Sequence, residues 1–260
     1  MAKNKRLVKI KAGRLCRIIE YTQALATDAP AARAAKHRCS SAARMRINAR
    51  TCREACEEAM AANFDRRDLF CTFTFREAPP TREAAVRAMN SFLRQLRAVR
   101  AARGDRLIYI KKAEHIRDDG SEGRWHYHVI LNSTGRDYEE IRSLWATWGD
   151  NVDFEGLLSD GESYESRARY LCKEKPPAGK QTWTPSRGLK KPQRTSELVD
   201  ETLTVTPDSL PAGAVILEHS EDRNEWGSFV YYKYLLPYRE PRFDPRRKRG
   251  DGGGDPPRRA

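Results

Sequence analysis

Two histidines separated by one residue, His126 and His128, are the side chains in this sequence best suited to chemistry. They lie in the segment RWHYHVILN, which has the composition of a β-strand. Because side chains at positions i and i+2 of a strand point to the same face, the two imidazoles project together. Such a pair suits a divalent cation. The alternative is a pair of unconnected surface histidines.

A third metal ligand is expected on the preceding segment, RLIYIKKAE, if the two segments form a hairpin. With a turn at residues 119–121, Glu114 pairs directly with His126 and its carboxylate lies on the same sheet face. A two-residue turn shifts the register and turns Glu114 away, and His115 is then the alternative ligand. Two histidines and one carboxylate leave coordination positions open for water and phosphate, which favours Mg²⁺ or Mn²⁺.

Tyr170 and Lys173 are three residues apart in a predicted helix over residues 162–174, so their side chains share one face. A tyrosine hydroxyl becomes an effective nucleophile when its target is polarised, and a metal ion on a phosphate does this. The alternative for Tyr170 is a residue that only packs on the sheet. Tyr164 lies about 120° away around the helix, so the two tyrosines cannot easily act on one phosphate.

The composition limits the class of protein. The 260 residues include 49 Lys and Arg against 36 Asp and Glu, which gives a net charge of +13 and makes polyanions the expected partners. No apolar run approaches the roughly 18 residues of a membrane span, and the cationic N-terminus leads into no apolar signal region. We therefore expect neither secretion nor insertion into a membrane.

The cysteine pattern favours reduced thiols in a cytoplasm over a disulfide scaffold. A zinc site is conceivable at His37, Cys39, Cys52 and Cys56. The tight paired knuckles of zinc modules are missing, however, so cysteines that pack as small buried residues are favoured.

Alternating strand and helix patterns predict an α+β fold with an antiparallel sheet backed by helices. In LFCTFTF, Cys71 and Phe73 point one way and Thr72 the other, as in a half-buried strand. The helix that follows is capped by Thr81, and its apolar stripe runs through Ala85, Met89, Phe92, Leu96 and Val99. The predicted organisation is a basic, mostly helical N-terminal arm (1–63), a central domain (64–195), a short β-rich extension (196–240) and a disordered basic tail (241–260).

Three segments in this order, LFCTFTF, WHYHVIL and YLCK, resemble the three motifs of HUH endonucleases. The resemblance covers about residues 64–195 and is closest to the rolling-circle replication (Rep) proteins of bacterial plasmids and phages. It implies a five-stranded antiparallel sheet with packed helices. It also implies that His126, His128 and, less securely, Glu114 bind the metal ion, that Tyr170 is the nucleophile, and that Lys173 accompanies it.

The family cuts one DNA strand at an origin, keeps the 5′ phosphate on tyrosine, and later rejoins the strand. The resemblance therefore predicts a metal-dependent, single-tyrosine nicking and joining enzyme that starts rolling-circle replication in a bacterial cytoplasm. Its expected partners are single-stranded origin DNA and, because the chain lacks a Walker-type motif, a host helicase and polymerase. The alternatives are a relaxase or HUH transposase with the same chemistry, and a non-catalytic site-specific DNA-binding regulator.

Contacts with DNA are expected from basic side chains, which neutralise phosphates, and from one tryptophan that could stack on an unpaired base. The blander roles are solvated rim residues and a tryptophan that pins a loop to the core. The candidates are Arg124, Lys175, Lys180, Trp183, Arg187, Lys190 and Lys191.

Overall fold

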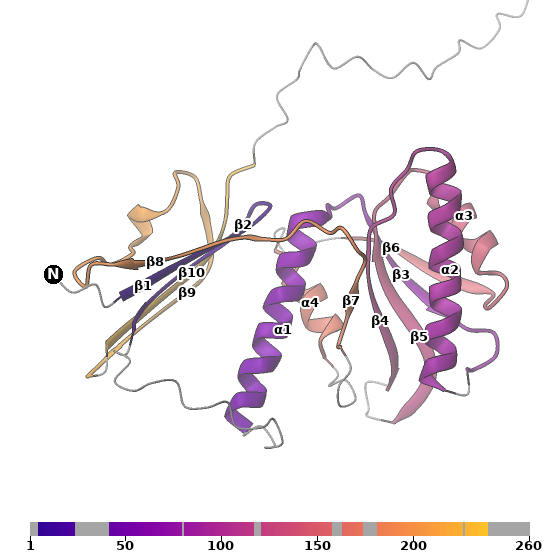
Figure 1. Ribbon diagram of the computed structural model, residues 1–260, viewed down its shortest axis with the longest axis horizontal. Helices are drawn as coiled ribbons and strands as arrows, with labels where there is room; N and C mark the ends of the chain where they lie inside the picture. Colours follow the sequence, from indigo (N-terminus) through magenta and orange to yellow (C-terminus); the bar gives the residue numbers. More distant parts are fainter. Residues whose placement is uncertain are drawn as a thin grey trace, which may run out of the picture.

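Period-two sequence patterns fold into ten strands, which pair into two antiparallel sheets with four α-helices around them (Figure 1). The computed structural model describes residues 5–23, 42–79, 81–116, 121–157, 163–173, 181–225 and 227–238. The predicted α+β class and antiparallel sheet are confirmed. No helix in these ranges is both long enough and apolar enough to cross a membrane.

The first sheet contains the strands predicted to carry the chemistry. Its strand order is β6-β3-β5-β4-β7, with β6 and β7 at the edges. The members are β3 (Leu69–Thr74), β4 (Tyr109–Ile116), β5 (Glu122–Leu131), β6 (Asn151–Gly156) and β7 (Thr184–Pro185).

One face of this sheet is covered by α2 (Arg82–Ala102) and α3 (Asp137–Trp145). Their core includes Phe73, Met89 and Trp145, all fully buried. The predicted cap is confirmed, since the side chain of Thr81 accepts a hydrogen bond from the backbone of Ala84. The expected apolar stripe continues to Leu96 but not to Val99, which is 40 % exposed. Arg100 is buried instead, because its guanidinium pairs with Asp137 at 2.6 Å.

The second sheet is assembled from both ends of the chain. Its order is β8-β1-β2-β10-β9, so the N-terminal hairpin lies between strands that follow the first sheet in sequence. One face packs around Ile18, Val205 and Tyr232. The members are β1 (Lys5–Ala12), β2 (Leu15–Thr22), β8 (Gln193–Val199), β9 (Val215–Asn224) and β10 (Gly227–Leu235), with a short 3₁₀ turn, η1 (Pro207–Ser209).

The prediction of a mostly helical N-terminal arm is wrong for residues 5–22, which form β1 and β2. Every second residue from Val8 to Ala12 is apolar and buried, which is the period of a strand and not of a helix. Helix appears only in α1 (Ala42–Asn63). The β-rich extension is present as strands β9 and β10, whereas the predicted disordered tail, 241–260, lies outside the described residues. The domain boundaries themselves stay a prediction.

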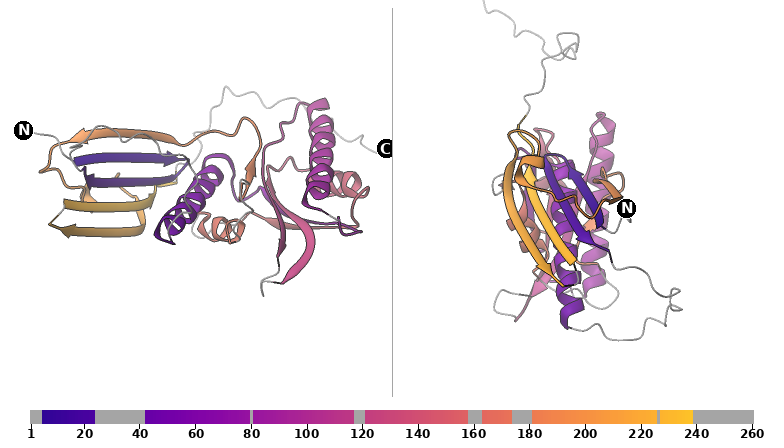
Figure 2. Two further views of the ribbon diagram at one scale, coloured as in Figure 1. Left: turned by 60° about the horizontal axis from the view of Figure 1, so that its bottom comes forward. Right: turned by 90° about the vertical axis from the view of Figure 1, so that its left-hand side faces the viewer.

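Helices α1 and α4 (Glu165–Leu171) lie between the two sheets, as both Figure 1 and Figure 2 show. They share a core with the second face of the first sheet, which includes Met60, Ile130 and Leu171. Helix α4 is shorter than the predicted 162–174. It begins after Tyr164, whose left-handed backbone (φ 59°) interrupts the helical conformation, and it ends at Leu171.

Candidate functional site

The strand register brings the predicted ligands together on one face of the first sheet. Glu114 of β4 pairs directly with His126 of β5, as the hairpin arithmetic predicts, and Thr72 of β3 pairs with His128. Side chains of directly paired residues share a sheet face. The pairing of β4 with β5 shifts after Glu114, where the strands have a bulge, and the turn itself lies partly outside the described residues.

Glu114, His126 and His128 form a compact group of potential metal ligands. One ligand atom from each lies within 4.8 Å of the other two, and it is the group of this kind that the described residues contain. Glu114 and His128 are buried, whereas His126 is half-buried, so the group opens to solvent on one side. A set of two imidazoles and one carboxylate suits a divalent cation with open positions.

Hydrogen bonds to the outer ring nitrogens orient both imidazoles. Nδ1 of His126 lies 3.0 Å from the backbone oxygen of Arg124. Because a carbonyl only accepts, Nδ1 carries the proton and Nε2 keeps its lone pair for a metal ion. Nδ1 of His128 lies 3.1 Å from the hydroxyl of Thr72. These contacts are the kind that a metal-binding histidine makes with its second nitrogen, so the residues fit a bound cation.

Two lysines hold the Glu114 carboxylate in its charged form. Nζ of Lys173 lies 2.8 Å from one carboxylate oxygen, and the buried Lys112 lies 3.1 Å from the other. Burial on its own raises the pKa of Glu114, but hydrogen bonds from His128 and Lys173 and the charge of Lys112 outweigh it and lower that pKa. Glu114 is therefore an anion, which is the form that binds a metal ion.

His128 is held in its neutral form. Burial lowers its pKa, and the neighbouring His126 lowers it further, while Glu114 acts in the opposite direction. The ring of Phe70 stacks against it with centroids 5.5 Å apart. A neutral imidazole is a metal ligand, whereas an imidazolium is not.

Tyr170 reaches this cluster from α4. Its hydroxyl lies 3.1 Å from Nε2 of His128, and its ring lies 4.5 Å from Nζ of Lys173. Tyr170 is 37 % exposed, so a solvent-borne substrate can reach it. Tyr164 lies elsewhere: its buried hydroxyl donates to the backbone oxygen of Phe64 at 3.0 Å, and burial raises its pKa to about 12.

His115, the alternative third ligand, is not a member of the cluster. It follows Glu114 at the bulge, and its ring stacks on Trp125 with centroids 4.1 Å apart. Of the conceivable zinc set, His37 and Cys39 lie outside the described residues. Cys56 is fully buried in the core between α1 and the first sheet, and Cys52 lies 3.9 Å from the sulfur of Cys172.

The predicted DNA contacts are scattered. Arg124 is exposed, and its guanidinium donates to the backbone oxygens of Phe75 and Arg76, at 2.7 Å each. Trp183 is half-buried and packs against the core that includes Met60 and Leu171. The remaining described candidates, Arg187, Lys190 and Lys191, are exposed. Lys175 and Lys180 lie outside the described residues. A DNA-contacting role for any of them stays a prediction.

Sequence reasoning missed Lys112 and Thr72. Lys112 lies two residues before Glu114, so the strand period already places both side chains on one face. Thr72 was assigned to the correct face of its strand, but its partner depends on the register between β3 and β5, which hydrophobic alternation does not provide.

Comparison with known proteins agrees with this site. Residues 68–175 match a family model described as replication-associated protein ORF2, and this segment contains Glu114, His126, His128, Tyr170 and Lys173. No curated protein and no solved structure matches the chain. The match confirms the predicted resemblance to replication-associated proteins, and it supports a role in DNA replication.

Proposed function

We propose that this protein nicks and rejoins single-stranded DNA at a replication origin through a 5′-phosphotyrosine intermediate on Tyr170, and so starts rolling-circle replication. The observation that carries the proposal is the hydroxyl of Tyr170 lying 3.1 Å from Nε2 of His128, within a group of two imidazoles and a carboxylate. The match to replication-associated proteins supports the choice of DNA as substrate.

In the proposed reaction, the phenol oxygen of Tyr170 attacks the phosphorus of one phosphodiester. The bond from phosphorus to the 3′ oxygen breaks, the 3′ oxygen takes up a proton, and the 5′ phosphate stays on tyrosine. A Mg²⁺ or Mn²⁺ ion held by Glu114, His126 and His128 would supply Lewis-acid polarisation of that phosphate. Lys173, whose ammonium lies 4.5 Å from the centre of the Tyr170 ring, stabilises the charge that develops as the phenol loses its proton.

A tyrosine nucleophile also explains how the strand can be rejoined. The phosphotyrosine retains the energy of the phosphodiester bond, whereas a water nucleophile would release it. The attack of a later 3′ hydroxyl on the phosphotyrosine then restores the DNA strand and frees Tyr170. We further propose that a host polymerase extends the first 3′ hydroxyl, that a host helicase unwinds the duplex, and that the protein acts in a bacterial cytoplasm.

The proposal is tested by formation of a covalent complex. A labelled single-stranded oligonucleotide from the DNA flanking the gene is incubated with protein and Mn²⁺, and denaturing gels are examined for a protein–DNA band. The Tyr170→Phe variant should give no band. The matched control is Tyr138→Phe, which removes the same hydroxyl from a tyrosine that is 55 % exposed on α3, and it should give a wild-type band.

The same assay separates the competing functions. A protein that binds the oligonucleotide but forms no band with any flanking sequence would be a DNA-binding regulator instead. A band with transfer-origin or transposon-end DNA, and none with a replication origin, would favour a relaxase or a transposase.

A further inference from the structure

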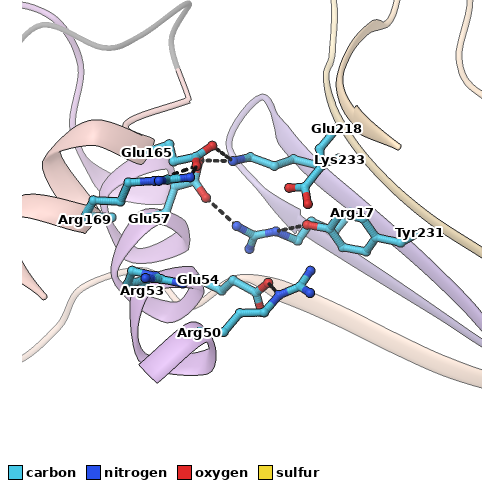
Figure 3. A pocket seen from close by; sticks show the side chains of 11 residues that line it. Arg17, Arg50, Arg53, Glu54, Glu57, Glu165, Arg169, Glu218, Tyr231 and Lys233 are labelled. Carbon is cyan, nitrogen blue, oxygen red and sulfur yellow. Dashed lines mark hydrogen bonds and ion pairs between the residues drawn. The ribbon is translucent and has the colours of Figure 1, made fainter. Parts of the chain in front are cut away.

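A network of buried charges joins the second sheet to the helix that carries Tyr170. Lys233 of β10 is almost fully buried, and its Nζ lies 2.8 Å from Glu165 of α4 and 2.8 Å from Glu57 of α1. Arg17 of β2, which pairs with Lys233 across the sheet, lies 2.5 Å from the other oxygen of Glu57. Figure 3 shows these side chains meeting from three elements.

The titration behaviour of these groups is that of a strong ion pair. The hydrogen bond from Lys233 lowers the pKa of Glu165 to about 2. Burial on its own lowers the pKa of Lys233, but the hydrogen bonds to Glu165 and Glu57 outweigh it, and the pKa is raised. Both groups are therefore charged at neutral pH.

The cavity beside this network, of about 230 Å³, does not suit an anionic ligand. Its lining holds five cationic side chains, but four carboxylates lie among them. Arg50 pairs with Glu54, and Arg169 pairs with Glu165. The positive charge is thus largely neutralised within the protein, which points to a connection between elements and not to a phosphate site.

The orientation of α4 depends on such connections because the helix has only seven residues. Isolated helices of that length are not stable in water, so tertiary contacts hold it. Leu171 anchors one end in the core, and Arg167 pairs with Glu155 of β6 at 2.8 Å. The contact between Glu165 and Lys233 fixes the first turn, five residues before Tyr170.

We propose that Lys233, acting through Glu165, is a positioning residue for Tyr170, and that the second sheet thereby sets the orientation of the nucleophile helix. This inference rests on the proposed function of Tyr170. Residues 68–175 match the family model, so Glu165 lies within the matched segment while Lys233 and Arg17 lie outside it. The second sheet is then a part of the catalytic unit and not an independent attachment.

The test is a single-turnover measurement of covalent-complex formation with the full chain. Glu165→Gln removes the charge from α4 but leaves Lys233 paired with Glu57, so the fold is retained. We expect the rate at saturating DNA and Mn²⁺ to fall about tenfold, because small displacements of a reacting group are costly in rate. The DNA concentration that gives half the maximal rate should stay within about twofold of wild type, since no DNA contact is removed.

The matched control is Arg169→Gln, which removes the other cation paired with the same carboxylate and leaves the Lys233 contact in place. It should react at the wild-type rate. Lys233→Arg should also retain the rate, and Lys233→Met should slow it. The double variant Glu165→Gln/Lys233→Met should be no slower than Lys233→Met alone, because the two residues act through one contact.

The inference is overturned if Glu165→Gln reacts at the wild-type rate, or if Arg169→Gln is slowed equally. An effect on half-saturation alone, with an unchanged maximal rate, would also overturn it, because the network would then act on DNA binding. Failure of the proposed function looks different: the wild-type protein itself would form no covalent complex.

Discussion

The hydroxyl of Tyr170 lies 3.1 Å from Nε2 of His128, although the two residues come from a short helix and from a strand 42 positions earlier in the chain. Glu114 lies 3.3 Å from the same nitrogen. The tyrosine oxygen, the imidazole and the carboxylate therefore meet at one point, where a cation can contact all of them. This geometry makes the metal affinity and the nucleophile identity separately testable.

Glu114→Gln should weaken the binding of Mn²⁺ by at least about tenfold, because an anionic ligand becomes a neutral one. Isothermal titration of the protein with Mn²⁺ alone measures this without any reaction. The matched control is Glu197→Gln, which removes the charge of an exposed carboxylate on β8 and should leave the affinity unchanged.

The loss of Glu114 leaves the buried Lys112 without its counter-charge, so His126→Ala serves as a second ligand variant that keeps this pair. It should weaken Mn²⁺ binding as well. Wild-type affinity in both folded variants would place the metal ion elsewhere.

Thr72→Val should lower Mn²⁺ affinity by about 10- to 100-fold, because the variant keeps the shape of the side chain but loses the contact with Nδ1 of His128. The control is Thr74→Val on the same strand, which pairs with His126 and not with His128. Calorimetry of both variants with Mn²⁺ compares them directly. Equal affinities would show that Thr72 does not orient the ligand.

Asp137→Asn should lower the free energy of unfolding by about 3 to 5 kcal/mol at neutral pH, because it leaves the fully buried Arg100 without its charge partner. Burial on its own raises the pKa of Asp137, but hydrogen bonds from Thr134 and Ser133 and the charge of Arg100 lower it overall. Its stabilising contribution is therefore present above the unfolded-state pKa of about 3.9 and is lost as the pH falls through the lower folded-state value.

Urea unfolding between neutral pH and about pH 3 measures this dependence. The wild-type protein should lose more stability below about pH 4 than Asp137→Asn does. The control is Asp222→Asn on the exposed strand β9, whose stability should follow the wild-type curve. Parallel curves for wild type and Asp137→Asn would contradict the assignment of this pair.

The ligand group was predictable because strand periodicity and antiparallel pairing are local rules. Placing Glu114 opposite His126 required only the assumption of a hairpin, and the pairing is confirmed even though the strands contain a bulge just beyond it. The opposite face of β5, with Tyr127 and Val129 in the core beneath α2, follows from the same alternation.

The second sheet was not predictable from the same rules. β1 pairs with β8, nearly two hundred residues later in the chain, so that Val8 faces Ser196. Local patterns contain no information on such distant partners. The high positive charge near the N-terminus suggested a phosphate-contacting arm, and it obscured the apolar alternation of Val8, Ile10 and Ala12.

The contact between Lys233 and Glu165 was equally inaccessible, because neither residue belongs to a motif. Its discovery requires the placement of α4 between the two sheets. The length of α4 was overestimated for a related reason: helix propensity continues across Tyr164, and only the left-handed backbone there ends the helix.

The most direct measurement of the central claim is mass spectrometry of the trapped protein–DNA complex. After digestion of both protein and DNA, we expect the peptide that contains Tyr170 to carry a nucleotide linked through its 5′ phosphate to the tyrosine oxygen. A nucleotide on Tyr164 or on any other residue, or cleavage of the DNA with no protein adduct at all, would contradict the account.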